Sequence, residues 1–167
     1  MRPPSAPLVA VLLGTDHHRF DRLLAWLVRL EEQRLFRFHV QHGSTPLPSR
    51  LEGAPLLAPV ALGGLLDRAC AVVAHGGPGS IMDAREHGHV PVVVPRDPRR
   101  GEHVDDHQLR FARFLAGTGL VSVATEEHQL ATRLSLAVVA RPQAAAVRTP
   151  SPTLARFEAL VEELVHR

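Results

Sequence analysis

Short apolar runs that alternate with longer amphipathic segments constrain the fold of this chain more than any other feature. In the longer segments, apolar residues recur three or four positions apart, which is typical of helices that bury one side. This alternation is typical of β-α-β units, in which helices cover a parallel sheet. We therefore expect an α/β fold: a Rossmann-like open parallel sheet of about five or six strands with helices on both faces.

The order of these patterns gives a coarse map of one domain, residues 1–167. The expected strands are Leu8–Leu13, Phe36–Gln41, Ala71–Ala74, Pro91–Pro95 and Leu120–Val123. The expected helices cover 19–34, Leu62–Arg68, the segment from Ser80 to His87, Val104–Leu115 and Glu126–Ala140. Residues 141–153 are linker-like, and residues 154–166 are expected to form a C-terminal amphipathic helix.

The composition fits a domain that is stable without a disulfide bond or a structural metal ion. The chain has 167 residues, of which 45% are hydrophobic, and its one cysteine, Cys70, has no intramolecular partner. All 19 basic residues are Arg, yet the net charge is only +2 and there are seven aromatic residues, so nucleic acid is not an expected partner. No signal peptide and no apolar stretch of ~20 residues is evident, and the expected location is cytoplasmic.

A glycine-rich loop, His75-Gly76-Gly77-Pro78-Gly79-Ser80, lies between an expected strand and an expected helix. Glycines let the backbone approach a ligand, and amides near Gly79, Ser80 and Ile81 suit a diphosphate at the positive end of the helix dipole. Asp83, one turn later, suits a ribose diol. The structural alternatives are a tight turn capped by Ser80 and a favourable interaction of Asp83 with the helix dipole.

A second polar segment, Gly101–Gln108, follows the expected strand at Pro91–Pro95. Its hydrogen-bonding side chains suit a polyhydroxylated ligand, although acidic residues also favour a helix start. His103 and His107 are four positions apart and would share a helical face. The zinc-protease motif requires Glu where this chain has Val104, so we expect no metal ion.

Two further loops are expected at the same edge of the sheet. Gly14 and Thr15 follow the first strand, and Gln41–Thr45 follows the second. Among the eleven histidines, only His75, His103 and His107 stand out at strand ends.

In this order, the segments resemble the C-terminal domain of glycosyltransferase family 28. The residues that carry the resemblance are Gly14-Thr15, Phe20–Leu23, Gln41–Thr45, His75–Ser80, Val94–Arg96 and Gly101–Gln108. The similarity is greatest to short soluble donor-binding subunits of two-part bacterial polysaccharide glycosyltransferases and of the eukaryotic dolichol-linked GlcNAc transferase.

The resemblance implies the C-terminal half of a GT-B enzyme that binds a nucleotide-diphosphate sugar, most often a UDP-sugar. Asp83 stands at the family's ribose-binding Glu, and His107-Gln108 at its paired Gln residues near the sugar. The donor is a substrate, so no cofactor is expected. His75 and His107 are the candidates for proton transfer or sugar orientation, and the expected donor-binding residues are Gly14, Thr15, Gly76, Gly77, Gly79, Ser80, Ile81, Asp83, Arg96, Glu102, His103, Asp106 and Gln108.

The family resemblance covers only one half of a GT-B enzyme. We therefore expect a membrane-associated partner subunit that binds a lipid-linked or polysaccharide acceptor, inverting transfer, and recruitment to the inner face of the membrane. An apolar stripe in the C-terminal helix offers a surface for docking or for internal packing. Whether the isolated chain also forms a homo-oligomer stays open.

Three other functions fit parts of this sequence pattern. A non-catalytic nucleotide-sugar-binding regulatory module would bind the same donor without transfer. A nicotinamide-dependent oxidoreductase is disfavoured because the glycine loop follows a late strand. A zinc hydrolase would require the metal that the motif does not support.

Overall fold

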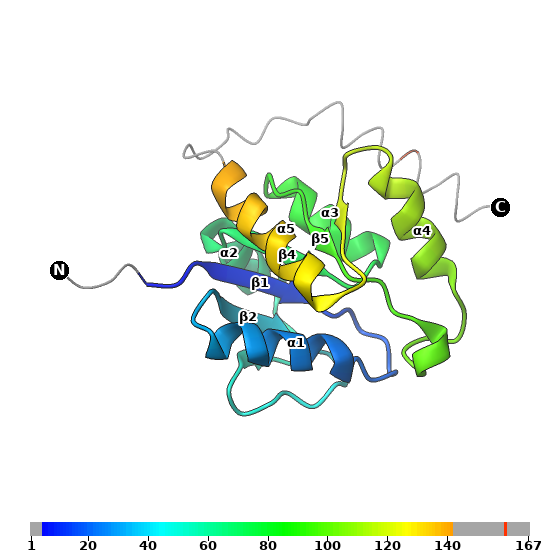
Figure 1. Cartoon of the computed structure of the whole chain (residues 1–167), viewed down its shortest axis with the longest axis horizontal. Helices are drawn as coiled ribbons and strands as arrows, with labels where there is room; N and C mark the ends of the chain where they lie inside the picture. The colour runs from blue at the N-terminus through cyan, green and yellow to red at the C-terminus, as the bar shows by residue number, and fades with distance from the viewer. Residues whose placement is uncertain (1–4, 142–158, 160–167) are drawn as a thin grey trace.

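The chain forms a six-stranded parallel sheet with strand order β3-β2-β1-β4-β5-β6. The computed structural model describes residues 5–141 and Ala159. The strands are β1 (Leu8–Leu12), β2 (Arg37–Gln41), β3 (Glu52–Ala54), β4 (Ala71–Ala74), β5 (Val92–Val93) and β6 (Ser122–Val123). The chain adds β2 and β3 on one side of β1 and then returns to add β4, β5 and β6 on the other (Figure 1). This confirms the expected fold class.

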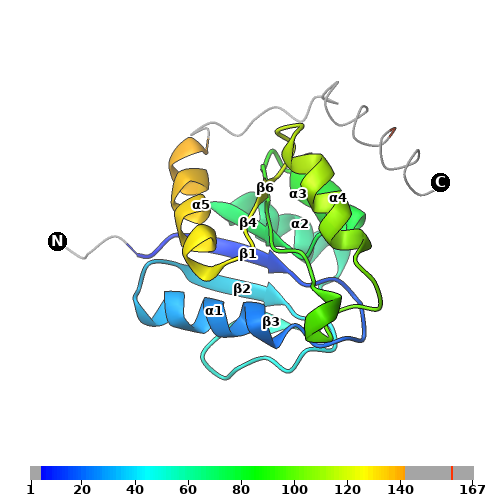
Figure 2. The same ribbon diagram turned by 45° about the vertical axis from the view of Figure 1, so that its right-hand side comes forward.

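In the part of the chain that the structure describes, five helices cover the two faces of the sheet (Figure 2). They are α1 (Asp21–Glu32), α2 (Pro59–Arg68), α3 (Pro78–Glu86), α4 (His107–Ala116) and α5 (Glu127–Ala140), and a short 3₁₀ turn, η1, covers Pro98–Arg100. Helices α1 and α5 pack on one face, whereas α2, α3 and α4 pack on the other.

Strand β1 shows why the sheet needs helices on both sides. Val9 and Val11 lie in the core beneath α1 and α5, while Ala10 and Leu12 contact residues of α2 and α3. Alternate side chains of a strand point to opposite faces, so a continuous apolar run is stable only when both faces are covered. The expected central strand is thereby confirmed.

Several expected boundaries differ from the structure. The sequence did not predict β3, which is short and contains Gly53, where a side chain would collide with the Val40 carbonyl. Helix α3 begins inside the glycine loop, at Pro78, because proline is favourable in a first helical turn. Helix α4 begins at His107 instead of Val104. The expected linker and C-terminal helix lie almost entirely outside the described residues.

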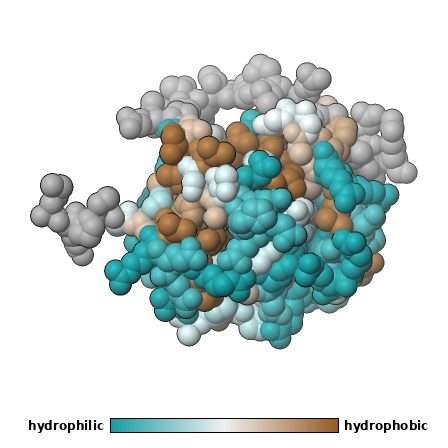
Figure 3. Space-filling view, in the orientation of Figure 1, coloured by the Kyte–Doolittle hydropathy of each residue, from teal (hydrophilic) through white to brown (hydrophobic). Residues whose placement is uncertain are grey.

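The surface shows a division between polar and apolar regions (Figure 3). Hydrophilic residues dominate the side where α1 lies, and hydrophobic residues gather toward α5, where Leu136 and Val139 are 63% and 85% exposed. Among the described helices, none has the length and apolar character needed to cross a bilayer.

Truncation of the α1 contact with the sheet should destabilise the fold. Leu27 is fully buried among residues of both α1 and the sheet, so Leu27→Ala is expected to lower the free energy of unfolding by about 2–5 kcal/mol. Leu35→Ala is the matched control, since Leu35 is 46% exposed and should cost less than about 1 kcal/mol. Urea denaturation measures both; equal losses would contradict this account of the core.

Candidate functional site

The loops that follow β1, β4 and β5 meet at the carboxyl edge of the sheet. Strands β1 and β4 are neighbours, and the chain turns outward in opposite directions from them. In open α/β sheets, a crevice forms outside the strand ends at this switch point, and ligands bind there. The candidate site is therefore the edge formed by residues 13–20, 75–80 and 94–108.

Arg96 joins the loops that follow β1 and β5 from inside the fold. Its side chain is 1% exposed, and Nη2 donates to the Leu13 carbonyl at 2.9 Å. Nη1 donates to the carbonyls of His18 and Glu102 at 2.7 and 3.1 Å, and the guanidinium lies 4.8 Å from the centre of the Phe20 ring. The sequence predicted Arg96 as a donor contact; its bonds to backbone carbonyls support a positioning role.

Glu102 is likewise buried, at 4% exposure. Its carboxylate accepts two hydrogen bonds of 2.8 Å from Arg22 and one of 2.8 Å from the backbone N–H of Asp97. Such bidentate arginine–carboxylate pairs hold a fixed geometry. The pair ties α1 to the β5–α4 loop, and here too the bonds support a positioning role for a residue predicted to bind donor.

His75 lies between the loops that follow β1 and β4. A side chain at Gly14 or Gly77 would collide with its imidazole ring, so the backbone encloses it closely. The ring is 8% exposed, and Nδ1 has no hydrogen-bond partner among the described residues. Burial, assisted by the charge of Arg96, lowers the pKa of His75 to about 4. The imidazole is therefore neutral at pH 7 and suits hydrogen bonding better than general-base catalysis.

The start of α3 presents backbone amides beside His75. Gly77 is the N-cap and no side chain caps the helix, so the alternative of a turn capped by Ser80 is wrong. The amide of Ile81 already donates to the Gly77 carbonyl at 3.3 Å, and its side chain is buried. Among the described residues, the amides of Gly79 and Ser80 in this turn have no hydrogen-bond acceptor. Because Gly79 is exposed and has open space beside it, an anion can approach this turn.

Other predicted site residues lie around this turn. Gly76 adopts a left-handed conformation, with φ of 98°, and packs against Gln108. Gln108 is buried and accepts the Arg96 backbone N–H at 3.4 Å. Asp83 is half-buried in α3, and burial raises the pKa of its carboxyl. Thr15 is exposed at the edge.

The polar segment before α4 forms a second part of the edge. His103 precedes the helix and His107 begins it, so they do not share a helical face as the spacing suggested. Their rings nevertheless approach to 4.6 Å between centres. Asp106 precedes the helix, is exposed and pairs with Arg110 at 3.1 Å.

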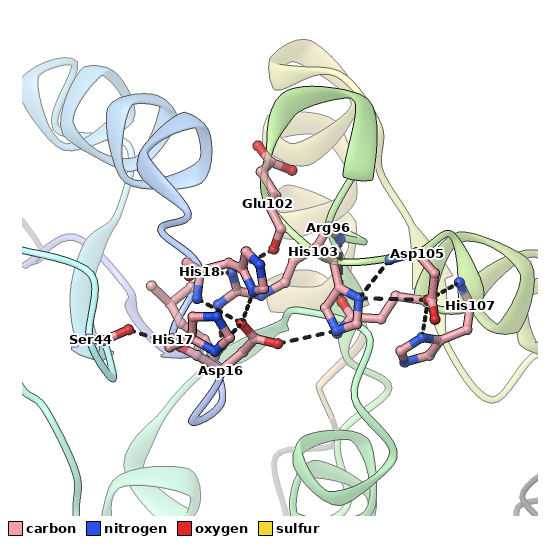
Figure 4. A network of polar contacts seen from close by, with 11 residues as sticks. Asp16, His17, His18, Ser44, Arg96, Glu102, His103, Asp105 and His107 are labelled. Atoms are coloured by element: carbon pink, nitrogen blue, oxygen red, sulfur yellow. Dashed lines mark hydrogen bonds and ion pairs between the residues drawn. The ribbon is translucent and has the colours of Figure 1, made fainter.

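One contact between distant segments was not predicted. His103 Nε2 lies 3.2 Å from Asp16 Oδ2, and Asp16 accepts the backbone N–H of His18 at 2.7 Å (Figure 4). Ser44 donates to the Asp16 carbonyl at 2.9 Å, which ties in the loop after β2. The sequence signal was only the accumulation of polar residues after several strands; which of them meet depends on loop conformation.

Comparison with known proteins identifies the family. Residues 61–164 match the model of the glycosyltransferase family 28 C-terminal domain. The chain belongs to this family. The matched range contains the glycine loop and the β5–α4 segment, whereas Gly14-Thr15 and Gln41–Thr45 lie outside it.

Individual relatives are longer than this chain. L-demethylnoviosyl transferase from Streptomyces niveus is 34% identical over 125 residues, which cover 71% of this chain and 31% of the relative. The chain thus spans about a third of that relative's length.

Solved structures share the fold. The calicheamicin glycosyltransferase CalG4 superposes with a TM-score of 0.62 at 19% identity, over 99% of this chain and 42% of that one. MurG from Acinetobacter baumannii superposes with a TM-score of 0.52 at 20% identity, over 97% of this chain and 54% of MurG. The glycosyltransferase VinC, solved in complex with DTDP, superposes with a TM-score of 0.51 at 23% identity, over 99% of this chain and 42% of VinC.

The close packing of His75 on Gly14 can be tested by a double-mutant cycle. Gly14 has φ of 72° and no room for a side chain, so Gly14→Ala should lower the free energy of unfolding by more than the ~1–2 kcal/mol cost of left-handed backbone. In a His75→Ala background the collision disappears, so the loss should shrink toward that backbone cost. Urea denaturation measures all four proteins. Gly79→Ala is the control, because a side chain there would meet open space. If Gly14→Ala lowers the free energy of unfolding equally in the wild-type and His75→Ala backgrounds, the packing is refuted.

The low pKa of His75 predicts loss of stability in mild acid. The unfolded chain binds a proton near pH 6.5, whereas folded His75 resists protonation until about pH 4. This residue's contribution is therefore present at pH 7 and declines as pH falls below 6.5. By pH 5 the loss from this group should be about 2 kcal/mol. Denaturation of wild type and His75→Gln at both pH values measures it; identical pH dependences would contradict a neutral buried His75.

Proposed function

We propose that this chain is the donor-binding half of a GT-B glycosyltransferase and binds a nucleotide-diphosphate sugar at the carboxyl edge of its sheet. The observation that carries the proposal is the start of α3. The amides of Gly79 and Ser80 have no acceptor among the described residues, and they follow Gly77, whose backbone packs against the neutral ring of His75. Helix amides favour a diphosphate, and they also stabilise the negative charge that develops on it as a leaving group.

The nucleotide is proposed to lie across the switch point, with its diphosphate at α3. Asp83 lies one turn beyond Ser80 in the same helix, which suits contact with a ribose diol. His75 would form a hydrogen bond with the diphosphate or the sugar, as donor or as acceptor. His107 is the second candidate for orienting the sugar. Arg96 would act through the loops that it holds.

UDP is the proposed nucleotide, from the family resemblance. The DTDP complex of VinC makes a thymidine diphosphate the competing candidate. A thymidine diphosphate carries one more methyl group on the base and lacks the ribose 2′-hydroxyl, and therefore the diol proposed to contact Asp83. Affinity for the two nucleotides has to be compared directly.

Sugar transfer would require an acceptor-binding half, because this chain spans only 31–54% of the relatives described above. We propose that a membrane-associated partner supplies it, that the acceptor is lipid-linked or a growing polysaccharide, and that transfer inverts the sugar configuration. A catalytically silent nucleotide-sugar-binding module is the second candidate, since the same edge would bind donor in either case.

Donor binding can be tested on the purified chain by thermal unfolding with UDP, TDP, GDP, UDP-GlcNAc and NAD. A ligand at 100 times its dissociation constant should add about 2.7 kcal/mol, or several degrees. Ser80→Ala with Asp83→Ala should remove most of the shift with UDP compounds. Ser135→Ala is the matched control, because Ser135 is exposed on α5 and bonds only within that helix.

Each outcome of this experiment has a distinct meaning. A larger shift with TDP would replace the proposed nucleotide, and a shift with NAD alone would refute the donor site. Transfer of labelled sugar on addition of the acceptor-binding partner would support catalysis. Tight UDP-sugar binding with no transfer in that complex would favour the regulatory module.

A further inference from the structure

The segment before α4 brings three potential metal ligands together. His103 Nδ1 lies 3.6 Å from Asp105 Oδ1, and His107 Nδ1 contacts the same carboxylate oxygen (Figure 4). One ligand atom from each residue lies within 4.8 Å of the other two. The imidazole rings meet edge to face, so their nitrogens approach the carboxylate from different directions.

We propose that His103, Asp105 and His107 bind a divalent transition-metal ion of the Zn²⁺ class, so that His107 is a metal ligand and not the direct sugar contact considered above. Zinc–ligand bonds of ~2.0–2.2 Å place neighbouring ligand atoms of a tetrahedral site about 3.4 Å apart, close to the His103–Asp105 separation. The His107–Asp105 contact has to open slightly, and these side chains are 51% and 55% exposed, which leaves them free to rotate. Two imidazoles favour zinc, nickel or copper over calcium or magnesium.

A contact from another part of the chain orients the first ligand. Asp16 Oδ2 lies 3.2 Å from His103 Nε2, so a proton on Nε2 leaves the Nδ1 lone pair available on the side of Asp105. The Asp105 backbone N–H lies 3.4 Å from Nδ1, which identifies Nδ1 as the acceptor atom, and a bound ion would replace this long hydrogen bond. Asp16 is itself held by His18. A carboxylate behind a ligating histidine is a recurrent feature of zinc sites.

A neighbouring group, Asp16, His17 and His18, competes for the same kind of ion. His17 is 85% exposed and its Nδ1 is 4.0 Å from Asp16, whereas His103 is 9% exposed and its Nδ1 is 3.6 Å from Asp105. These contacts favour the site at His103 and give the experiment its control. The sequence predicted no metal because the chain lacks the helical zinc-protease motif. The site proposed here lies mostly in the loop before α4 and does not require that motif.

The test is metal binding by the untagged full-length chain. Competition of Zn²⁺ with a chromophoric chelator should give about one tight site, and Co²⁺ should give the absorption of a four-coordinate complex. Asp105→Asn, His103→Ala and His107→Ala should each weaken Zn²⁺ binding at least tenfold. Asp16→Asn should weaken it about 10–100-fold, as expected for a supporting carboxylate.

Two matched variants separate this site from adventitious binding. Asp106→Asn changes the adjacent carboxylate, and His17→Ala changes the neighbouring group; both should retain wild-type affinity. Unfolding measured in the presence of a chelator checks that each metal-free variant folds. Asp105→Asn is the principal test variant, because Asp105 is exposed and its substitution should disturb the fold least. Equal affinity in Asp105→Asn and wild type, loss confined to His17→Ala, or no binding tighter than that of free histidine would overturn the proposal.

Discussion

The buried guanidinium of Arg96 is the interaction on which the carboxyl edge of the sheet depends. It bonds backbone carbonyls on both sides of the switch point, at Leu13 and His18 in one loop and at Glu102 in another. The loops that follow β1 and β5 thus share one rigid donor. Because buried carbonyls need partners, removal of this side chain would leave several of them unsatisfied.

The same residue shapes the electrostatics of the edge. Arg96 adds to the burial that keeps His75 neutral, and the nearby charges of Asp16 and Glu102 oppose the lowering of its own pKa by burial. Glu102 is fixed in turn by Arg22 from α1. Charged groups here organise the loops from within, while the positive end of α3 faces the space proposed for a diphosphate. This arrangement would let a chain with a net charge of only +2 bind the proposed diphosphate at one helix start.

The sequence was most informative where local physical chemistry decides the outcome. The continuous apolar run at β1 and the periodic helices predicted the parallel sheet, and the strand ends located the edge that carries the polar residues. It was less informative at β3, whose three residues carry no strand pattern, and at α4, whose start depends on the loop that Arg96 and Glu102 hold. Arg96 itself has the same charge whether it faces a ligand or the interior, and only its surroundings distinguish the two roles.

The sequence by itself determined the α/β class, the family resemblance and the strand-end positions of His75, His103 and His107, because periodicity and local turn chemistry act over a few residues. Only the tertiary structure decided that Arg96 and Glu102 support loops and that Asp16 lies against His103. These outcomes depend on which loops come together in space, and residues far apart in a chain acquire their neighbours only through packing of the whole sheet and its helices.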